Sequence, residues 1–393
     1  MPEAIHILGM MSGTSADGMD AALLRWTGEG PGSLLGHWHS PYPPDFQEQI
    51  FAAQGPVSAT TLARLDRQLG LRHGAFALEL QQQGTSFDLV AMHGQTVLHQ
   101  PDDPFPHTLQ IGSPYDLAEA SGVTVAHDFR RADLCVNGQG APLTPLYHQV
   151  LLARSEPILV LNLGGMANLS WIPAHGSTAP LRAFDSGPGN VLLDAAVQWL
   201  SQGKLRFDQN GQWAQTGQVN EEVLSRWLRW EYFQKPPPKS TGREQFNQSL
   251  VQELWQQWQG SQADFLATLT ALTARSIAQA VQNWLPPARK MLVFGGGARN
   301  LLLMEQLRLA LPEIVMDPGN VALGIPVEAL EAMAFAWLGG QCLLGFAPPL
   351  AGVTGQQHPM VLGSLYPGRN WSSLCAAITR WHATRITPLD DAQ

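Results

Sequence analysis

Two Gly-rich segments with hydroxyl and acidic residues are the first places where this sequence could do chemistry. Residues 9–20 read GMMSGTSADGMD, and residues 162–168 read NLGGMAN. Glycines and short hydroxyl residues let backbone N–H groups close on phosphate oxygens, and the carboxylates of Asp17 and Asp20 can hold Mg²⁺ directly or through its water shell. Two such loops facing each other could grip one polyphosphate, although either loop alone is equally consistent with a hairpin turn that binds nothing.

Two further turns carry candidate chemistry. Residues 183–190, AFDSGPGN, deliver Asp185 from a strand end into a tight turn before a helix expected from Val191. The positive end of that helix would lie beside an anion site, so Asp185 is a candidate general base, or else an aspartate that only caps the turn. Residues 295–300, GGGARN, permit close backbone approach to an adenine or ribose, or form a simple strand-to-helix turn.

The histidines and cysteines do not indicate a metal centre. The sequence has 12 His and 3 Cys, without a C-x-x-C pair. His37, His39, His99 and His107 fall in segments that we interpret as polar loops without ligand spacing, whereas His93 follows a strand and could line a cleft. The usual Walker, dinucleotide-binding, zinc-protease and serine-hydrolase signatures are absent as well, so a bound nucleotide must be held in another way.

The elements that must position these residues alternate between strands and helices. Apolar runs predict strands at 5–9, 89–92, 123–126, 158–162 and 290–294. Helical spacing is found at 57–83, 191–202, 263–285, 300–311 and 327–344. This alternation predicts an α/β protein built on parallel sheets, and the two strand-to-glycine-loop units suggest a duplicated domain.

Length and charge restrict the classes of function. The chain has 393 residues and a formal charge of −9, from 23 Lys+Arg and 32 Asp+Glu. Two domains are expected at this length, and the acidic balance argues against binding nucleic acid or an anionic membrane surface. We find no Sec signal and no apolar run long enough to span a bilayer, so we expect a protein of the reducing cytoplasm.

Taken together, these motifs resemble one enzyme family, the anhydro-N-acetylmuramic acid kinases. The matching blocks stand in the family's order from residue 9 to about residue 370. They are residues 9–20, 93–96 (HGQT), 128–131 (DFRR), 138–142 (GQGAP), 162–165, 184–190, 239–244 (KSTGRE) and 295–300. The resemblance places the chain in the superfamily of actin, sugar kinases and Hsp70 ATPases. It implies two similar actin-like (ribonuclease H-like) α/β domains, residues 1–130 and 131–393, flanking an ATP and substrate cleft, with a C-terminal helix that packs on either domain.

The resemblance also implies the reaction. ATP and water would convert 1,6-anhydro-N-acetylmuramic acid into N-acetylmuramic acid 6-phosphate and ADP during cell-wall recycling, with ATP and Mg²⁺ as cofactors. Asp185 matches the family's catalytic base, which would deprotonate the water that opens the anhydro ring. A homodimer is expected from the family, and no other partner is implied beyond the amino sugar and water.

The site residues follow from the same match. The residues expected to bind the nucleotide are Gly13, Thr14, Ser15, Ala16, Asp17, Gly18, Met19, Asp20, Asn162, Gly164, Gly165, Gly187, Gly295, Gly296, Gly297 and Asn300. Those expected at the sugar are His93, Gln95, Arg130, Asp185 and Glu331.

Some assignments leave alternatives open. The guanidinium of Arg130 suits the lactyl carboxylate of a muramic acid, or it forms a structural ion pair with Asp128 or Asp133. Glu328 lies one helical turn from Glu331 and could take its place. A kinase of another sugar would keep the phosphate loops but change the sugar-facing residues, and an actin-like or chaperone-like ATPase would need a partner-binding module that we do not find.

Overall fold

The computed structural model describes residues 4–13, 16–243 and 245–385. Its contacts group the chain into two compact units. Unit 1 comprises Met1–Leu151, Glu328–Pro349 and Gln356–Gln393, and unit 2 comprises Leu152–Val327 and Leu350–Gly355.

Unit 1 is built on a mixed sheet with the strand order β13-β7-β4-β1-β2-β3. Its strands are β1 (Ile5–Met11), β2 (Gly18–Trp26), β3 (Ser33–Pro41), β4 (Leu89–Met92), β7 (Thr124–His127) and β13 (Ser364–Tyr366), with a separate hairpin of β5 (Gln95–Gln100) and β6 (His107–Ile111). Its helices are α1 (Pro44–Ala52), α2 (Ala59–Gln82), α3 (Pro114–Ser121), α4 (Arg131–Cys135), α5 (Thr144–Leu152), α13 (Val327–Leu343) and α14 (Trp371–Arg385).

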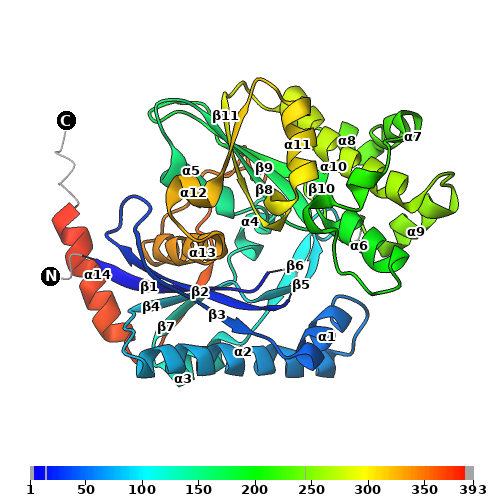
Figure 1. Cartoon of the computed structure of the whole chain (residues 1–393). Helices are drawn as coiled ribbons and strands as arrows, with labels where there is room; N and C mark the ends of the chain where they lie inside the picture. Colours follow the sequence, from blue (N-terminus) through cyan, green and yellow to red (C-terminus); the bar gives the residue numbers. More distant parts are fainter. Residues whose placement is uncertain (1–3, 14–15, 244, 386–393) are drawn as a thin grey trace. The chain divides into compact units, whose positions relative to one another are not determined.

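Alternate residues of β1 point to opposite faces of this sheet. Leu8 and Met10 belong to one buried cluster with Leu69 of α2. Gly9 points the other way, where a Cβ atom would overlap the carbonyl oxygen of Ala332 in α13. Figure 1 shows α2 and α3 on one side of the sheet and α13 on the other. The glycine therefore lets a helix from late in the chain lie directly against the first strand.

Unit 2 has a sheet with the order β10-β9-β8-β11-β12. The strands are β8 (Ile158–Leu163), β9 (Met166–Ile172), β10 (Arg182–Pro188), β11 (Lys290–Phe294) and β12 (Val315–Pro318). The helices are α6 (Val191–Leu200), α7 (Glu221–Trp227), α8 (Glu231–Gln234), α9 (Gln248–Gln256), α10 (Gln262–Trp284), α11 (Leu301–Ala310) and α12 (Gly319–Leu323), and short 3₁₀ turns are η1 (Gln209–Gly211), η2 (Ala214–Thr216) and η3 (Gly296–Arg299).

The segment between β10 and β11 has an aromatic core of its own. Trp227, Tyr232, Phe233, Phe246 and Phe265 are buried in one cluster with aliphatic residues of α6 and α10. Phe233 and Phe246 lie almost parallel, with ring centroids 6.1 Å apart. Large rings packed in this way give the segment a rigid base, and α8 contacts β10 directly.

The two sheets share one topology. In each sheet the first two connections are antiparallel hairpins, β1–β2–β3 in unit 1 and β8–β9–β10 in unit 2. The fourth strand then pairs parallel with the first, and the fifth parallel with the fourth. The repeated order confirms the predicted α/β class with two similar domains, and both Gly-rich loops occupy the same place, the turn after the first strand.

The bounds of the two units differ from the single boundary expected at residue 130. Residues 131–151 group with the N-terminal part, as do α13 and α14. Close packing explains the return of α13: besides Gly9 against Ala332, Gly339 faces Ala91 of β4 and Gly340 faces Trp26 of β2. The C-terminal helix α14 joins unit 1, where Asn370 just before it accepts hydrogen bonds from the backbone and hydroxyl of Thr124, both at 2.8 Å.

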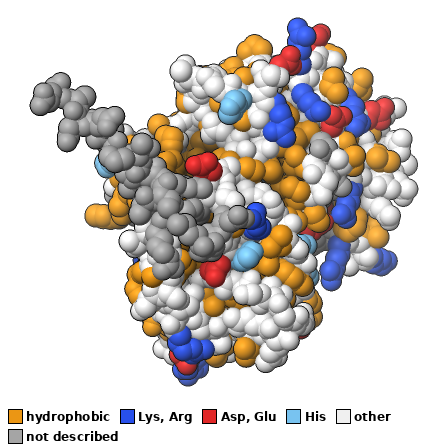
Figure 2. All heavy atoms as spheres, turned by 90° about the vertical axis from the view of Figure 1, so that its left-hand side faces the viewer, with side chains coloured by type: hydrophobic (Ala, Val, Ile, Leu, Met, Phe, Trp, Pro, Cys, Tyr) orange, Lys and Arg blue, Asp and Glu red, His pale blue; other side chains and the backbone are white. Residues whose placement is uncertain are grey.

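The surface carries few charges. Only 14% of the residues are charged, and on the face in Figure 2 acidic and basic side chains lie among hydrophobic and uncharged ones. In the described part of the chain, none of the helices has the length and apolar character needed to cross a bilayer.

Candidate functional site

Asp185 lies in β10 of unit 2, where the strand is interrupted by a β-bulge. Asp185 pairs with Asn168 of β9, but the next paired residue is Gly187, so Ser186 is the extra residue. The hydroxyl of Ser186 donates to the carbonyl of Ala167 at 3.0 Å, which fixes the bulge. Bulges redirect side chains near functional sites. Asp185, the residue before this bulge, is only 7% exposed.

Each carboxylate oxygen of Asp185 accepts a hydrogen bond. The side-chain amide of Asn168 donates to Oδ1, and the backbone N–H of Thr241 donates to Oδ2 at 3.0 Å. Donors on both oxygens favour the ionised form and fix the orientation of the group. Sequence reasoning identified Asp185 but gave no role to Asn168 or Thr241, although both stand in segments that it singled out.

The second Gly-rich loop packs against the turn that follows Asp185. The carbonyl of Gly164 accepts from the backbone of Asn190 at 2.9 Å, and that of Gly165 accepts from Gly189 at 2.8 Å. A Cβ atom on Gly189 would lie 2.5 Å from the Gly164 oxygen, so only glycine allows this approach, whereas a Cβ on Gly165 would meet open space. The loop therefore lies at the start of α6, the positive end of that helix, and its carbonyls accept the N–H groups of Gly189, Asn190 and Val191.

The third Gly-rich turn lies beside the same loop. Gly295 has φ = +86°, and a Cβ there would lie 2.6 Å from the carbonyl oxygen of Leu163 and 2.7 Å from the side chain of Asn162. Gly297 faces Asn190 in the same way, while a Cβ on Gly296 would meet nothing within 4 Å. Two glycines thus allow close packing, and the third leaves space above the turn.

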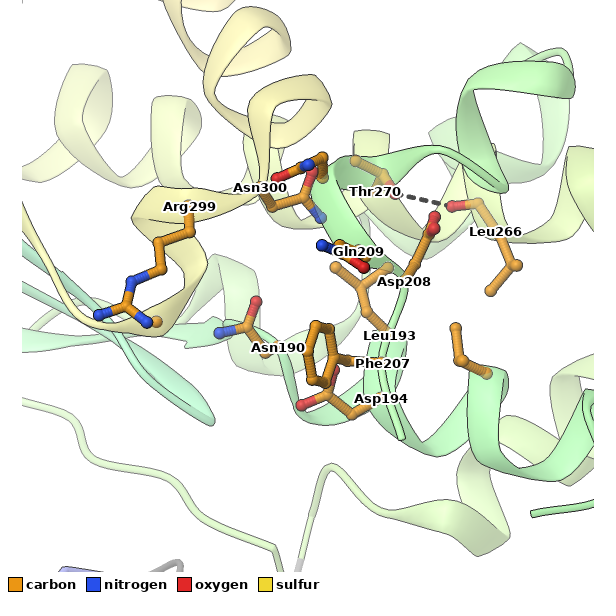
Figure 3. Close-up of a pocket in the computed structure, with 13 residues that line it drawn as sticks. Asn190, Leu193, Asp194, Phe207, Asp208, Gln209, Leu266, Thr270, Arg299 and Asn300 are labelled. Atoms are coloured by element: carbon orange, nitrogen blue, oxygen red, sulfur yellow. Dashed lines mark hydrogen bonds between the residues drawn. The ribbon is translucent and has the colours of Figure 1, made fainter. Parts of the chain in front are cut away.

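That space continues into a pocket of about 450 Å³ within unit 2, which Figure 3 shows. Leu193 and Phe207 supply apolar surface, and Gly296 and Asn300 supply part of the polar lining. Burial raises the pKa of Asp194, in the same lining, to about 6, although Arg243 opposes the rise. A half-apolar pocket with a few polar groups suits a flat heterocycle.

Of the other residues expected at the nucleotide, Asn300 and Gly187 have visible structural roles. The side chain of Asn300 accepts from the backbone of Leu303 at 3.1 Å and caps α11. Gly187, at φ = +147°, faces the ring of Phe233 at a distance that excludes a Cβ. The structure therefore brings Asn162, Gly164, Gly165, Gly187, Gly295, Gly296, Gly297 and Asn300 together within unit 2.

The first Gly-rich loop belongs to unit 1 and is held by Gln95. Its amide nitrogen donates to the carbonyl of Gly13 at 3.1 Å, and its oxygen lies 2.6 Å from the hydroxyl of Ser12. Ser12 is also 3.0 Å from the carbonyl of Gly18. Gln95, expected at the sugar, is therefore engaged in shaping this loop. Thr14 and Ser15, expected at the nucleotide, lie outside the described residues.

Within that loop the side chains divide by exposure. Ala16 and Met19 are buried in the hydrophobic core of unit 1, so only their backbones can face a ligand. Asp17 is exposed, and Asp20 at the start of β2 is partly exposed. The two carboxylates supply the oxygen donors that Mg²⁺ prefers, usually together with water and substrate phosphates.

Asp20 has two histidine neighbours that sequence analysis placed wrongly in a loop. His37 and His39 lie on β3, where His39 pairs with Asp20 across the sheet. The Nδ1 atom of His39 is 3.0 Å and the Nε2 atom of His37 is 3.4 Å from Oδ1 of Asp20. The alternation of His37 and His39 around Trp38 was the available signal, because side chains two residues apart lie on the same face of a strand. Among the described residues, no group of three or more His, Cys, Asp or Glu is arranged to hold a metal ion.

A second polar cluster of unit 1 contains three residues expected at the sugar. The Nε atom of Arg130 donates to Nε2 of His93 at 3.0 Å, and its Nη1 donates to the carbonyl of Gly140 at 3.0 Å. His93 Nδ1 lies 2.8 Å from the carbonyl of Gly94, which fixes Nε2 as the acceptor. Burial, and then Arg130, holds the pKa of His93 well below its usual value, so the ring is neutral.

Glu331 completes this cluster. Burial raises its pKa, the positive charge of Arg130 opposes the rise and the negative charge of Asp20 adds to it. Glu328, the alternative to Glu331, is exposed. Asp128 pairs with Arg131 at 2.8 Å. The structure thus joins Arg130 and His93 by a hydrogen bond, and Glu331 lies close enough for the charge of Arg130 to act on its pKa.

Comparisons with known proteins give one family. The profile described as anhydro-N-acetylmuramic acid kinase matches residues 5–368. A protein of that name from Acidithiobacillus ferrooxidans is 50% identical over 373 residues, 95% of each chain. Another from Cupriavidus metallidurans is 38% identical over 379 residues, 92% of this chain and 97% of the relative.

Solved structures show weaker likeness. An activator of 2-hydroxyisocaproyl-CoA dehydratase from Clostridium difficile, with bound ADPNP, has a TM-score of 0.40 at 13% identity and covers 86% of this chain and 96% of its own. A glucokinase from Streptomyces griseus has a TM-score of 0.38 at 13% identity, covering 86% and 99%. Such scores carry no argument about the site, whereas the sequence matches span nearly the whole chain. The chain belongs to the anhydro-N-acetylmuramic acid kinase family.

Proposed function

We propose that the protein phosphorylates 1,6-anhydro-N-acetylmuramic acid with ATP and opens its anhydro ring with water. The products are N-acetylmuramic acid 6-phosphate and ADP. The observation that carries the proposal is the Asp185 carboxylate, buried in β10 beside its bulge with a donor on each oxygen, in the strand whose following turn packs against the Gly164–Gly165 loop. Membership of the family supports the choice of substrate.

Asp185 acts as the general base in this proposal. It takes a proton from water as the water oxygen bonds to the anomeric carbon C1, and the C1–O6 bond breaks. The released O6 bonds to the γ-phosphorus of ATP, and the bond from that phosphorus to the bridging oxygen of ADP breaks. Phosphoryl transfer needs alignment and charge neutralisation more than covalent assistance, so one placed base and a set of backbone donors are sufficient.

The nucleotide is assigned to the Gly-rich turns. Gly164 and Gly165 approach the phosphates near the start of α6. The adenosine occupies the pocket shown in Figure 3, whose lining includes Gly296, Asn300 and Phe207. Mg²⁺ would neutralise the phosphates, with Asp17 and Asp20 of the first loop as its oxygen donors or as acceptors for its waters. The chain does not need a closed metal cage for this, because nucleotide phosphates supply most ligands of such ions.

The sugar is assigned to the cluster in unit 1. Arg130, oriented by the neutral ring of His93, suits the lactyl carboxylate of the muramic acid because a guanidinium can form two parallel hydrogen bonds with a carboxylate. Glu331 contributes an acceptor or donor for a sugar hydroxyl beside it. We also infer a cytoplasmic homodimer that works in cell-wall recycling, which size-exclusion chromatography with light scattering and cell fractionation would test.

The experiment is turnover in ¹⁸O-labelled water. Purified protein is incubated with Mg²⁺, ATP and 1,6-anhydro-N-acetylmuramic acid, and the products are followed by mass spectrometry. The proposal predicts a 6-phosphorylated sugar with ¹⁸O at the anomeric carbon. Activity on another sugar alone would keep the kinase chemistry and overturn the substrate, and phosphorylation without ¹⁸O would overturn the role of water.

A further inference from the structure

Lys239 is a buried cation for which the proposed reaction has no use. Its residue is only 2% exposed. The Nζ atom donates to the backbone carbonyl of Tyr232 at 2.9 Å and lies 4.7 Å from the centre of the Tyr232 ring and 5.8 Å from that of Phe184. A buried ammonium group is costly unless its charge and donors are satisfied, so this placement needs a reason.

The contacts of Lys239 form a closed ring with the proposed base. The backbone N–H of Asp185 donates to the carbonyl of Lys239 at 3.1 Å. The ammonium of Lys239 donates to the carbonyl of Tyr232 at 2.9 Å, and the hydroxyl of Tyr232 donates back to the carbonyl of Asp185 at 2.7 Å. Each residue is therefore both donor and acceptor, and none can shift without stretching a bond of the other two.

This ring also fixes a donor on the reacting carboxylate. Thr241, two residues after Lys239, directs its backbone N–H to Oδ2 of Asp185 at 3.0 Å. The ring is supported by packed aromatic side chains, since Tyr232 and Phe233 both contact Phe246. A segment without helix or strand structure is thus held against β10 at the register that the Thr241 donor requires.

The charge of Lys239 also acts on Asp185. Burial, and after it the charge of Lys235, lowers the pKa of Lys239 to about 8, against the opposing effect of the negative charge of Asp185. The group is therefore a cation at neutral pH. Because the attraction between the two charges is mutual, it also favours the ionised carboxylate.

We propose that Lys239 is a positioning residue for Asp185, which holds the Thr241 donor on the carboxylate through the Lys239–Tyr232–Asp185 ring and favours the ionised base through its charge. The inference rests on the proposed function, in which Asp185 accepts the proton of water. It assigns a role to the 239–243 segment and makes no use of the substrate's identity.

The test is the pH dependence of kcat at saturating Mg·ATP and sugar. Lys239→Met, which keeps an unbranched side chain one atom shorter and removes the ammonium group, should lower kcat by about 10- to 100-fold as the base loses its alignment, with both KM values unchanged. The acid limb of the profile should move to higher pH, because the base loses a neighbouring positive charge. Lys239→Arg keeps the charge, so its acid limb should stay in place.

A second variant separates the effect of the hydrogen-bonded ring from the effect of the charge of Lys239. Tyr232→Phe removes one hydrogen bond of the ring and keeps the charge of Lys239, so kcat should fall while the acid limb moves less than in Lys239→Met. This variant also decides the question if Lys239→Met does not fold, which thermal unfolding would show. Lys204→Met, at an exposed lysine of the same unit, is the matched control and should keep kcat within about twofold.

Several results would overturn the inference. One is unchanged kcat in folded Lys239→Met and Tyr232→Phe, and another is a lower kcat in Lys239→Met with the acid limb unmoved. Asp185→Asn, measured alongside, separates the two proposals: if it is active, the proposed function fails, and if it is inactive while Lys239→Met behaves as wild type, only the inference about Lys239 fails.

Discussion

Replacing Asn168 by alanine tests how the carboxylate of Asp185 is held. The variant removes the donor to Oδ1 and leaves the backbone donor of Thr241 on Oδ2. A hydrogen bond to a charged group contributes about 1.5–3 kcal/mol, and a loss of that size in the transition state corresponds to about 10- to 150-fold in kcat. Because the lost bond favours the ionised base, the acid limb of the kcat profile should also move to higher pH.

The assay is steady-state formation of ADP with the anhydro sugar from pH 5 to 9. KM for ATP should not change, since Asn168 is paired with Asp185 and does not line the pocket that we propose for the nucleotide. Asn283→Ala, at an exposed position on α10, is the control for the same replacement. A kcat within twofold of the control at every pH would refute the reasoning that Asn168 orients the base.

Three other predictions concern the fold and the nucleotide. Gly9→Ala should destabilise the protein by about 1–3 kcal/mol or more in urea unfolding, because its Cβ would overlap the Ala332 carbonyl; an unchanged midpoint would refute the close approach of α13 to β1. His73 is buried without a hydrogen-bond partner for either ring nitrogen, and burial lowers its pKa to about 4. On acidification the unfolded chain therefore binds a proton at His73 before the folded chain does. The contribution of the buried neutral ring to stability is complete above about pH 6.5 and is lost as the pH falls towards 4. His73→Phe should reduce this loss of stability between pH 7 and 5, and an unchanged dependence of stability on acid pH would contradict the prediction. Phe207→Ala should raise KM for ATP about fivefold or more, if its ring stacks on the base, with kcat unchanged; an unaltered KM would place the adenine elsewhere.

The parts of the fold that could be predicted from the sequence are those with a strong local pattern of apolar residues. The strands at 89–92 and 290–294 have the predicted bounds, and the long helices α2, α10 and α13 begin and end within two residues of the predicted ones. Buried strands that run into glycine turns are strong local signals. The candidate base at 185 was found in the same way, because its turn has a distinctive composition.

The features that could not be predicted from the sequence depend on contacts between residues that are far apart in the chain. The polar edge strand β3 was interpreted as a loop, because half-exposed strands have weak apolar patterns. The donors on Asp185 come from residues 168 and 241, and their pairing depends on strand register and on the packing of α8. The return of α13 to unit 1 depends on Gly9 of β1 and on Gly339 and Gly340 of the helix itself, a close contact that no short-range pattern reveals.

The central claim is that Asp185 activates water, and Asp185→Asn tests it most directly. The amide keeps the shape of the side chain but cannot take the proton, so kcat should fall by about 100- to 10,000-fold. The Kd for ATP, measured by calorimetry, should stay at the wild-type value. Asp317→Asn, at the edge of the same sheet, is the control. Full turnover in Asp185→Asn would contradict the account, and a fall of several orders of magnitude with intact ATP binding is the result it predicts.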